Sequence, residues 1–416
     1  TASVTALYVI LILAVHPIIY QDYYFNILNV KYLFYCACTI GMLILLGGYF
    51  IFTGAFKRIK LKLIPTDYAF LAFIVIATLS AAFSDFKYEA FWGNEGRFSG
   101  AFLLILYAAS YFCVSRLLKF KSWFMDIALL SCMAVCIFGF TDYLGMDLLH
   151  FKVRLKTEHM GMFTSFIGNI NMYTGLLSVY LGAACLLWVS CPNKLRSIWY
   201  YVNVWVIFIA LITGRSDNAY LSLAAAFTFI PIYAFRTRQG IRRYVVLLAT
   251  FLTSLKVIEW IATTYADRVY RIDSLYNSLA SFSKLILLIK VLWIIAIILY
   301  LIDFISKKAD ATVSPWFSRI WIGLIVIGFA AFLYVLYDVN IAGNADKYGS
   351  AKSFLLFSGN RGCVRGLRDS PGGLRNAGLP LLRRRRPEGQ QDLLCRPTDP
   401  QVRHCGFLPD RAKPVP

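Results

Sequence analysis

The placement of charged residues between apolar runs is the feature that most constrains this chain. Eleven apolar stretches are separated by short polar loops, and every second loop is rich in Lys and Arg. The intervening loops carry charges of both signs. Because loops enriched in Lys and Arg stay on the cytoplasmic side of a membrane, this alternation predicts a multi-pass membrane protein.

The apolar stretches also have the length that membrane-spanning helices need. Most contain about 17–22 residues, and roughly 20 helical residues cross ~30 Å of hydrocarbon. The runs lack the alternation of apolar and polar residues that barrel strands show. We therefore expect helices, in which the backbone groups in lipid form hydrogen bonds within the segment. We predict an all-α, polytopic transmembrane helix bundle of about 11 spans, at roughly 4–20, 32–53, 67–84, 98–117, 123–144, 171–190, 197–213, 217–235, 244–262, 284–302 and 319–338.

The basic loops set the predicted orientation, with the N-terminus in the cytoplasm. They lie at 57–62, 116–121, 194–196, 236–243 and 307–319. The loops expected to face outward are 21–31, 85–97, 145–170, 214–216, 263–283 and everything after about 339. The chain does not begin with Met and shows no cleavable signal peptide, so we expect its N-terminus to be incomplete.

The composition agrees with a membrane protein and argues against nucleic-acid binding. Hydrophobic residues make up 59% of the 416 residues, and the mean hydropathy is +0.63. A formal net charge of +20 would indicate nucleic acid as the partner of a soluble protein. Here the charge comes from the basic loops and from a basic tail, so the expected partner is the lipid bilayer.

The tail differs abruptly from the rest of the chain. Residues 358–416 contain 11 Arg, 8 Pro and one Phe, but no Tyr, Trp or Ile. Such a segment cannot bury enough apolar surface to form a core, so one interpretation is a disordered basic tail. We favour the other, an out-of-frame translation caused by a nucleotide insertion or deletion near codon 358. The predicted organisation is a bundle over 1–338, the start of an outward loop over 339–357, and this tail.

Three segments on the predicted outward face carry side chains suited to chemistry. The first is FWGNEGRFSG at 91–100, in which glycines allow close backbone approach and Arg97 lies at the start of a helix. The planar guanidinium of Arg97 suits phosphate oxygens. The alternative interpretation is an Arg that reaches the membrane interface beside the anchor Trp92.

The second segment is FIGNINMYTG at 166–175, where another span begins. Asn169 or Asn171 is a natural N-cap, which is the purely structural interpretation. The basic loop before it contains Arg154 and His159, and a positive loop at a helix N-terminus suits an anion.

The third segment is TGRSDN at 213–218, which joins two spans. The link is so short that Arg215 must lie at or below the outer membrane surface. An Arg at that depth needs a partner or a substrate anion, and Asp217 is the structural alternative for that partner.

No motif for nucleotide or metal chemistry is present. The sequence lacks a Walker A segment, HExxH, GxSxG, a CxxC pair and any cluster with metal-ligand spacing. We therefore expect no metal and no cofactor, and we expect no ATP-driven transport by this chain alone.

Taken in order, the three segments resemble the bacterial O-antigen ligase/polymerase superfamily of membrane glycan transferases. The matching pieces are GNEGRFSG, FIGNINMYTG and TGRSDNAYL, and the resemblance covers most of residues 65–357. The Asn-Pro-Asn pattern usual in that family is Asn-Ile-Asn here. FSGNRG at 357–362 looks like the start of the family's long external loop, and the pattern is then lost.

The resemblance implies a reaction and a set of site residues. Such enzymes transfer a glycan from a polyprenyl-diphosphate carrier to an acceptor hydroxyl outside the cytoplasm, at the bacterial cytoplasmic membrane. We expect Arg97 and Arg215 to share one outward cavity and to stabilise the leaving diphosphate. The acceptor is unidentified. The remaining implied site residues are His159 as a substitute for the base that the lost loop would supply, and Arg154, Asn169, Asn171 and Arg361 in substrate binding.

Two other function classes compete with this interpretation. A secondary transporter or lipid-linked oligosaccharide flippase would carry charges at mid-membrane, for which Lys256, Glu259 and Lys290 are the only hints. Lys256 and Glu259 are spaced to pair on one helix. The other class is a membrane assembly protein without enzymatic activity.

Overall fold

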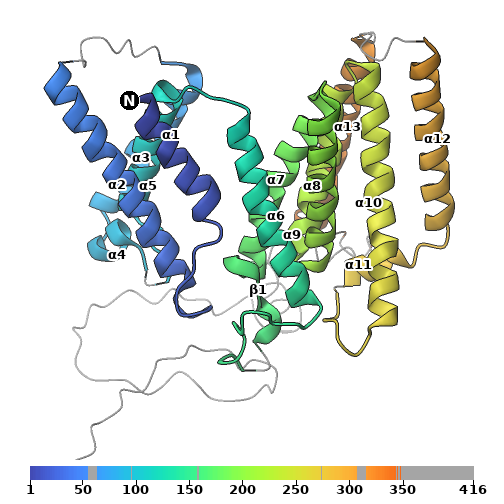
Figure 1. Ribbon diagram of the computed structural model, residues 1–416, viewed down its shortest axis with the longest axis horizontal. Helices are drawn as coiled ribbons and strands as arrows, with labels where there is room; N and C mark the ends of the chain where they lie inside the picture. Colours follow the sequence, from blue (N-terminus) through green and yellow to red (C-terminus); the bar gives the residue numbers. More distant parts are fainter. Residues whose placement is uncertain are drawn as a thin grey trace, which may run out of the picture. The chain divides into compact units, whose positions relative to one another are not determined.

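The computed structural model describes residues 1–54, 63–94, 96–156, 159–272, 274–306, 315–342, 344 and 347 (Figure 1). The fold is mostly helical, with one short hairpin. The helices are α1 (Ala2–Ile10), the π-helical turn η1 (Leu11–Val15), α2 (Ile27–Thr53), α3 (Pro65–Ala82), α4 (Lys87–Trp92), α5 (Ala101–Leu117), α6 (Trp123–Tyr143), the 3-10 turns η3 (Met160–Met162) and η4 (Ser165–Ile167), α7 (Ile170–Ser190), α8 (Lys194–Thr213), α9 (Asp217–Ala234), α10 (Arg238–Thr264), α11 (Ser274–Ala280), α12 (Leu285–Ser306) and α13 (Trp316–Asn340).

Eight of the described helices are long and apolar enough to cross a membrane, which confirms a helical, multi-pass membrane protein. These eight are α2, α3, α6, α7, α8, α10, α12 and α13. Two shorter apolar helices, Ala2–Val15 and Ala101–Leu117, and α9 occupy the other three predicted spans. The total of about 11 spans and the cytoplasmic N-terminus stay predictions.

The chain divides into two units, Thr1–Ala330 and Ala331–Pro416. The first contains all elements from α1 to α12. In the second, the structure describes the last turns of α13 and a few following residues. The predicted tail from 358 onward, and Arg361 within it, lie outside the described residues.

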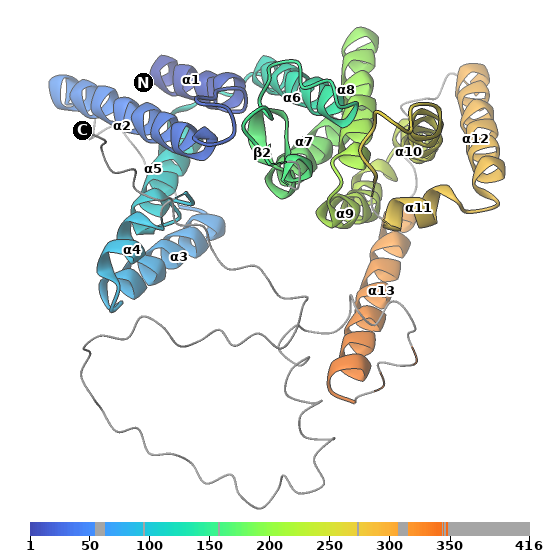
Figure 2. The same ribbon diagram turned by 90° about the horizontal axis from the view of Figure 1, so that it is seen from below.

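The largest core of the first unit lies among α6, α7, α8, α9 and α10, which Figure 2 shows side by side. Tyr173, Leu177 and Leu181 place one face of α7 in this core, each no more than 1% exposed. Gly139 of α6 permits the close approach of α6 and α7, because a Cβ at position 139 would lie 2.3 Å from the Tyr173 hydroxyl oxygen. Packing of this density fixes the ends of α6 and α7, which border the loops described below.

A second, smaller core joins α1, α2 and α5. Tyr8, Met42, Leu46 and Phe50 form its buried centre. The Tyr8 hydroxyl lies 2.9 Å from the Ser110 hydroxyl and so links α1 to α5 with a buried hydrogen bond. By contrast, only 11% of the most apolar segment of α12 is buried inside the protein. The apolar side chains of this helix therefore face outward, where lipid would surround a membrane protein.

The loops of the first unit meet at two ends of the bundle. One end of the bundle, which we call the basic end, contains the links 118–122, 191–193 and 235–237, which follow helices α5, α7 and α9. The opposite end carries the loop residues 16–26, 144–156, 159–169, 214–216 and 265–272, at the bottom of Figure 1. The loops of the opposite end are those predicted to face outward.

A two-stranded antiparallel hairpin shapes the opposite end. Strands β1 (Phe163–Thr164) and β2 (Gly168–Asn169) pair Phe163 with Asn169 and Thr164 with Gly168. The turn η4 connects them, and Gly168 has a φ of +88°, a conformation that favours glycine. The hairpin leads directly into α7 and so sets where that helix begins.

Candidate functional site

Arg215 lies in the three-residue link between α8 and α9, as the sequence predicts. Its backbone has a φ of +54°, in the left-handed region that residues other than glycine rarely adopt. Its Nη2 atom donates a hydrogen bond to the Gly161 carbonyl oxygen at 2.5 Å. A Cβ at position 161 would lie 3.3 Å from Nη1 of Arg215, so glycine leaves room for the guanidinium. The side chain is therefore held in place from both sides of its half-buried position.

Two cations share the ring of Tyr270. The guanidinium carbon of Arg215 lies 4.7 Å from the ring centroid, and the Lys152 ammonium lies 4.9 Å from it. Both distances allow cation–π attraction. The three residues come from the loop before α7, the link before α9 and the loop after α10, so tertiary packing alone brings them together.

A buried carboxylate completes what we call the Tyr270 cluster, defined as Asp142, Lys152, Arg215 and Tyr270. Asp142, at the end of α6, is 1% exposed, and its Oδ1 lies 3.4 Å from the Lys152 ammonium. Its Oδ2 accepts hydrogen bonds from the Tyr24 hydroxyl at 3.1 Å and from the Ser165 amide at 2.7 Å. The carboxylate thus ties Lys152 to the first loop and to the hairpin.

The environment of the cluster changes the proton affinity of its loop residues. Burial lowers the pKa of Lys152, and the nearby Arg215 charge acts in the same direction, whereas Asp142 opposes the change. Burial also raises the pKa of Tyr270, so its hydroxyl stays protonated near neutral pH. Lys152 is consequently a cation that gives up its proton more readily than a lysine in water.

The Tyr270 segment is fixed to the end of α6. The Tyr270 amide donates to the Tyr143 carbonyl oxygen at 3.2 Å. Gly145, with a φ of +69°, lets the chain pass close to Arg268, whose carbonyl oxygen would lie 2.7 Å from a Cβ at position 145. Because two backbone contacts hold this segment, the Tyr270 ring has a defined place beneath the two cations.

The two predicted asparagines start α7 and connect it to the link of Arg215. Asn169 is the N-cap, since its Oδ1 accepts from the Asn171 amide at 2.8 Å. Asn171 Oδ1 accepts in turn from the Ser216 hydroxyl at 2.7 Å. The structural interpretation of Asn169 is confirmed, and Asn171 helps to position the residue next to Arg215.

The predicted substrate contact Arg154 and the predicted base His159 are both exposed. Arg154 forms an ion pair with Asp22 at 3.1 Å, with side chains 62% and 50% exposed. His159 lies two residues before Gly161, the residue that accepts the Arg215 hydrogen bond. The loop therefore points Lys152 toward the cluster, while Arg154, two positions later, lies on the surface.

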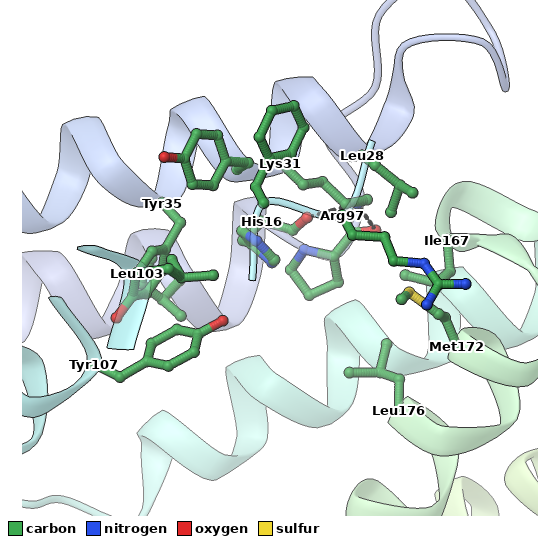
Figure 3. A pocket seen from close by; sticks show the side chains of 14 residues that line it. His16, Leu28, Lys31, Tyr35, Arg97, Leu103, Tyr107, Ile167, Met172 and Leu176 are labelled. Carbon is green, nitrogen blue, oxygen red and sulfur yellow. Dashed lines mark hydrogen bonds between the residues drawn. The ribbon is translucent and has the colours of Figure 1, made fainter. Parts of the chain in front are cut away.

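Arg97 lies elsewhere, at a cavity of about 420 Å³ among η1, α2, α5 and α7 (Figure 3). We call this the Lys31 cavity, after the buried lysine in its wall. Arg97 is among its lining residues, and so is Met172 in the first turn of α7. Arg215 is not among the described residues that line it. The two arginines have different described neighbours, and one shared outward cavity stays a prediction.

Two of the three charged residues that a transporter would use have structural contacts. Lys256 pairs with Glu259 at 2.5 Å, which confirms the predicted pairing, and also donates to the Ala280 carbonyl oxygen at 3.0 Å. Lys290 lies exposed on α12. These contacts explain Lys256 and Glu259 without a transported ion.

The sequence did not reveal Asp142, Tyr270 or the role of Lys152. Within the described ranges, no group of three or more His, Cys, Asp or Glu side chains could hold a metal ion. Comparison with protein-family models, curated proteins and solved structures gives no match for this chain.

Proposed function

We propose that this protein transfers a glycan from a polyprenyl-diphosphate carrier to an acceptor hydroxyl on the outer side of the bacterial cytoplasmic membrane. The observation that carries the proposal is the position of Arg215 and Lys152 on one Tyr270 ring. This pair lies at the end of the bundle whose loops are predicted to face outward. The resemblance of the Arg97, Asn169 and Arg215 segments to membrane glycan transferases supports the same reaction.

The chemistry of the leaving group explains why two cations suit this reaction. The acceptor oxygen forms a bond to the anomeric carbon as the bond from that carbon to the diphosphate oxygen breaks. Negative charge then accumulates on the departing diphosphate, and fixed cations stabilise it best where water is excluded. Arg215 supplies a planar pair of donors and Lys152 a compact charge.

The acceptor hydroxyl must lose its proton during transfer. His159 is the described residue proposed for this step, because it is exposed and lies two residues from Gly161, which contacts Arg215. An imidazole is the side chain that most often acts as a general base. Asp142 is not suited to this role, because its oxygens already contact Lys152, Tyr24 and Ser165. It acts as a positioning residue for Lys152.

The test compares Arg215 with a neighbouring arginine. In the full chain reconstituted in vesicles, Arg215→Lys should weaken binding of a polyprenyl diphosphate about tenfold, since a point charge cannot reproduce the guanidinium fork. In a chain whose reading frame is restored after codon 357, the same change should slow transfer by about 100-fold. Arg268→Lys is the control, because Arg268 is exposed and contacts Gly145 only through its backbone.

Two results would remove the assignment. One is near-normal binding and transfer by Arg215→Lys. The other is an equal loss in Arg268→Lys, which would show that the effect is not specific to the guanidinium at the Tyr270 ring.

A further inference from the structure

The Lys31 cavity combines a cationic wall with an apolar interior. Its apolar lining comes from segments far apart in the chain, represented by Ile12, Leu28, Leu103 and Leu176. Its polar lining includes His16, Lys31 and Arg97, whose side chains Figure 3 shows around one space. A cavity with both kinds of lining matches an amphipathic molecule better than a free ion.

Lys31 is a buried cation in this wall. It is 8% exposed, and its ammonium donates to the carbonyl oxygens of His16 at 2.7 Å and Pro17 at 2.9 Å. An ammonium has three donors, and the described residues supply no acceptor for the third and no carboxylate within 4.0 Å. A cation buried in apolar surroundings is costly without an anion, so the site favours a negatively charged occupant.

Arg97 stands over the cavity on a tightly built loop. Its side chain extends toward Ile167 and Met172 (Figure 3). A Cβ at Gly100 would lie 2.3 Å from the Phe91 carbonyl oxygen, so the two ends of this loop touch through their backbones. The ring of Phe98 stacks on Tyr32 of α2 at 4.5 Å between centroids. The loop is thus anchored on both sides of Arg97, which directs a second cation to the cavity.

We propose that the Lys31 cavity binds the phosphate headgroup of an acidic membrane phospholipid, with the start of an acyl chain against its apolar lining. Lys31 and Arg97 contact the phosphate, and Leu103 and Leu176 contact the chain. The site is distinct from the Tyr270 cluster and goes beyond the proposed transfer reaction. Its volume of about 420 Å³ is at the lower end of ligand cavities, enough for a headgroup and the first carbons but not for a whole lipid.

The experiment measures lipid binding by the purified full chain in a neutral detergent. Native mass spectrometry would count bound phosphatidylglycerol and phosphatidylcholine of identical chain length, with inorganic phosphate as a competitor. We expect phosphatidylglycerol to bind about tenfold more tightly than phosphatidylcholine, because a charge-assisted contact distinguishes them. Millimolar inorganic phosphate should not displace the lipid, because it lacks the apolar part.

Three variants locate the site. Lys31→Met keeps the length of the side chain without its charge, and it should weaken phosphatidylglycerol binding about tenfold. Arg97→Gln should weaken it less, because Arg97 is exposed. Lys87→Gln, on the exposed face of α4, is the control and should bind as the unaltered chain does. If Lys31→Met does not fold, Arg97→Gln and a cavity-filling Leu103→Trp still test the proposal.

The outcomes separate this site from the proposed transferase site. Arg215→Lys should leave phosphatidylglycerol binding unchanged, whether or not the chain transfers glycans. The proposal is overturned if phosphatidylcholine binds equally well, if free phosphate displaces the lipid, or if Lys87→Gln weakens binding as much as Arg97→Gln. Polyprenyl diphosphate binding that Lys31→Met weakens and Arg215→Lys does not would also overturn it, and would assign the cavity to the glycan carrier.

Discussion

The positively charged side chains have different contact partners at the two ends of the bundle. At the basic end, Arg196 pairs with Asp126 and Arg242 pairs with Asp303, at 2.8 and 2.7 Å. Arg243 donates to the carbonyl oxygens of Trp188, Val189 and Cys191 at the end of α7. At the opposite end, Arg215 and Lys152 face an aromatic ring, and Lys31 faces a cavity.

The difference shows that the number of cations does not identify a site. The basic end has more Lys and Arg, yet Arg196, Arg242 and Arg243 contact carboxylates or the C-terminal carbonyl groups of α7, where positive charge stabilises the fold. Arg242 also lies over the Tyr300 ring, so an aromatic contact alone does not identify a site. At the opposite end, Arg215 and Lys31 donate to carbonyl oxygens and Lys152 contacts the buried Asp142, whereas the exposed Arg154 pairs with Asp22. A cation that contacts neutral groups retains more of its field for a ligand than one that pairs with a carboxylate.

The largest expected effect is at Asp142. Asp142→Asn removes the carboxylate that contacts the buried Lys152 and should lower the free energy of unfolding by about 3 kcal/mol, since breaking a buried ion pair leaves one charge behind. Donor binding should weaken with it, because Lys152 loses its positioning residue. Unfolding in mixed micelles measures the first effect. Unchanged stability would mean that Asp142 does not hold Lys152.

Arg243 tests the basic end. Arg243→Gln should lower the free energy of unfolding by about 2 kcal/mol, because carbonyl groups at the end of α7 lose a charged donor. In the chain with the restored reading frame, transfer by the molecules that remain folded should not change. Size-exclusion chromatography before the assay gives the amount of folded protein, and activity is expressed per folded molecule. A selective loss of activity would contradict a purely structural basic end.

The pH dependence of donor binding tests Lys152. Because burial lowers its pKa, Lys152 loses its charge at a lower pH than a free lysine. Donor binding should therefore fall by up to about tenfold as the pH rises through that lowered pKa. Lys152→Arg should stay charged and move this fall to higher pH. An identical pH profile for both proteins would exclude Lys152 from donor binding.

The smallest effect is expected for an exposed ion pair of the basic end. The side chains of Arg196 and Asp126 are 44% and 24% exposed. Asp126→Asn should change the free energy of unfolding by about 0.5 kcal/mol, since solvent screens such pairs. Comparison with Asp142→Asn under the same conditions sharpens the contrast between the two ends. Equal losses would show that burial does not distinguish them.

Much of the fold follows from local patterns in the sequence. Apolar runs of sufficient length predicted the helices, and the N-cap role of Asn169 and the pairing of Lys256 with Glu259 follow from residue spacing within one helix. The position of Arg215 in a short link was also predictable, because a link of that length leaves no other place for the residue.

The Tyr270 cluster could not be predicted in this way. Asp142 and Tyr270 are 128 positions apart (270 − 142), and the close contact of the Gly145 and Arg268 backbones brings their segments together. Lys152 and Arg154 lie in one basic loop, so their sequence context does not show which of them turns inward. Which of the two side chains turns inward depends on the buried Asp142. In the sequence, Asp142 looks like one more residue of an apolar span.

The backbone of Arg215 has a consequence for how this protein can change. A left-handed conformation costs a residue with a side chain about 1–2 kcal/mol, whereas glycine adopts it freely. Arg215→Gly would therefore relieve the strained link, and a search for more thermostable variants would tend to select it. The same replacement removes the guanidinium from the Tyr270 ring. The side chain that contacts the Tyr270 ring is thus kept at a cost in folding free energy. A more stable variant that retains Arg215 would have to gain its stability at other positions.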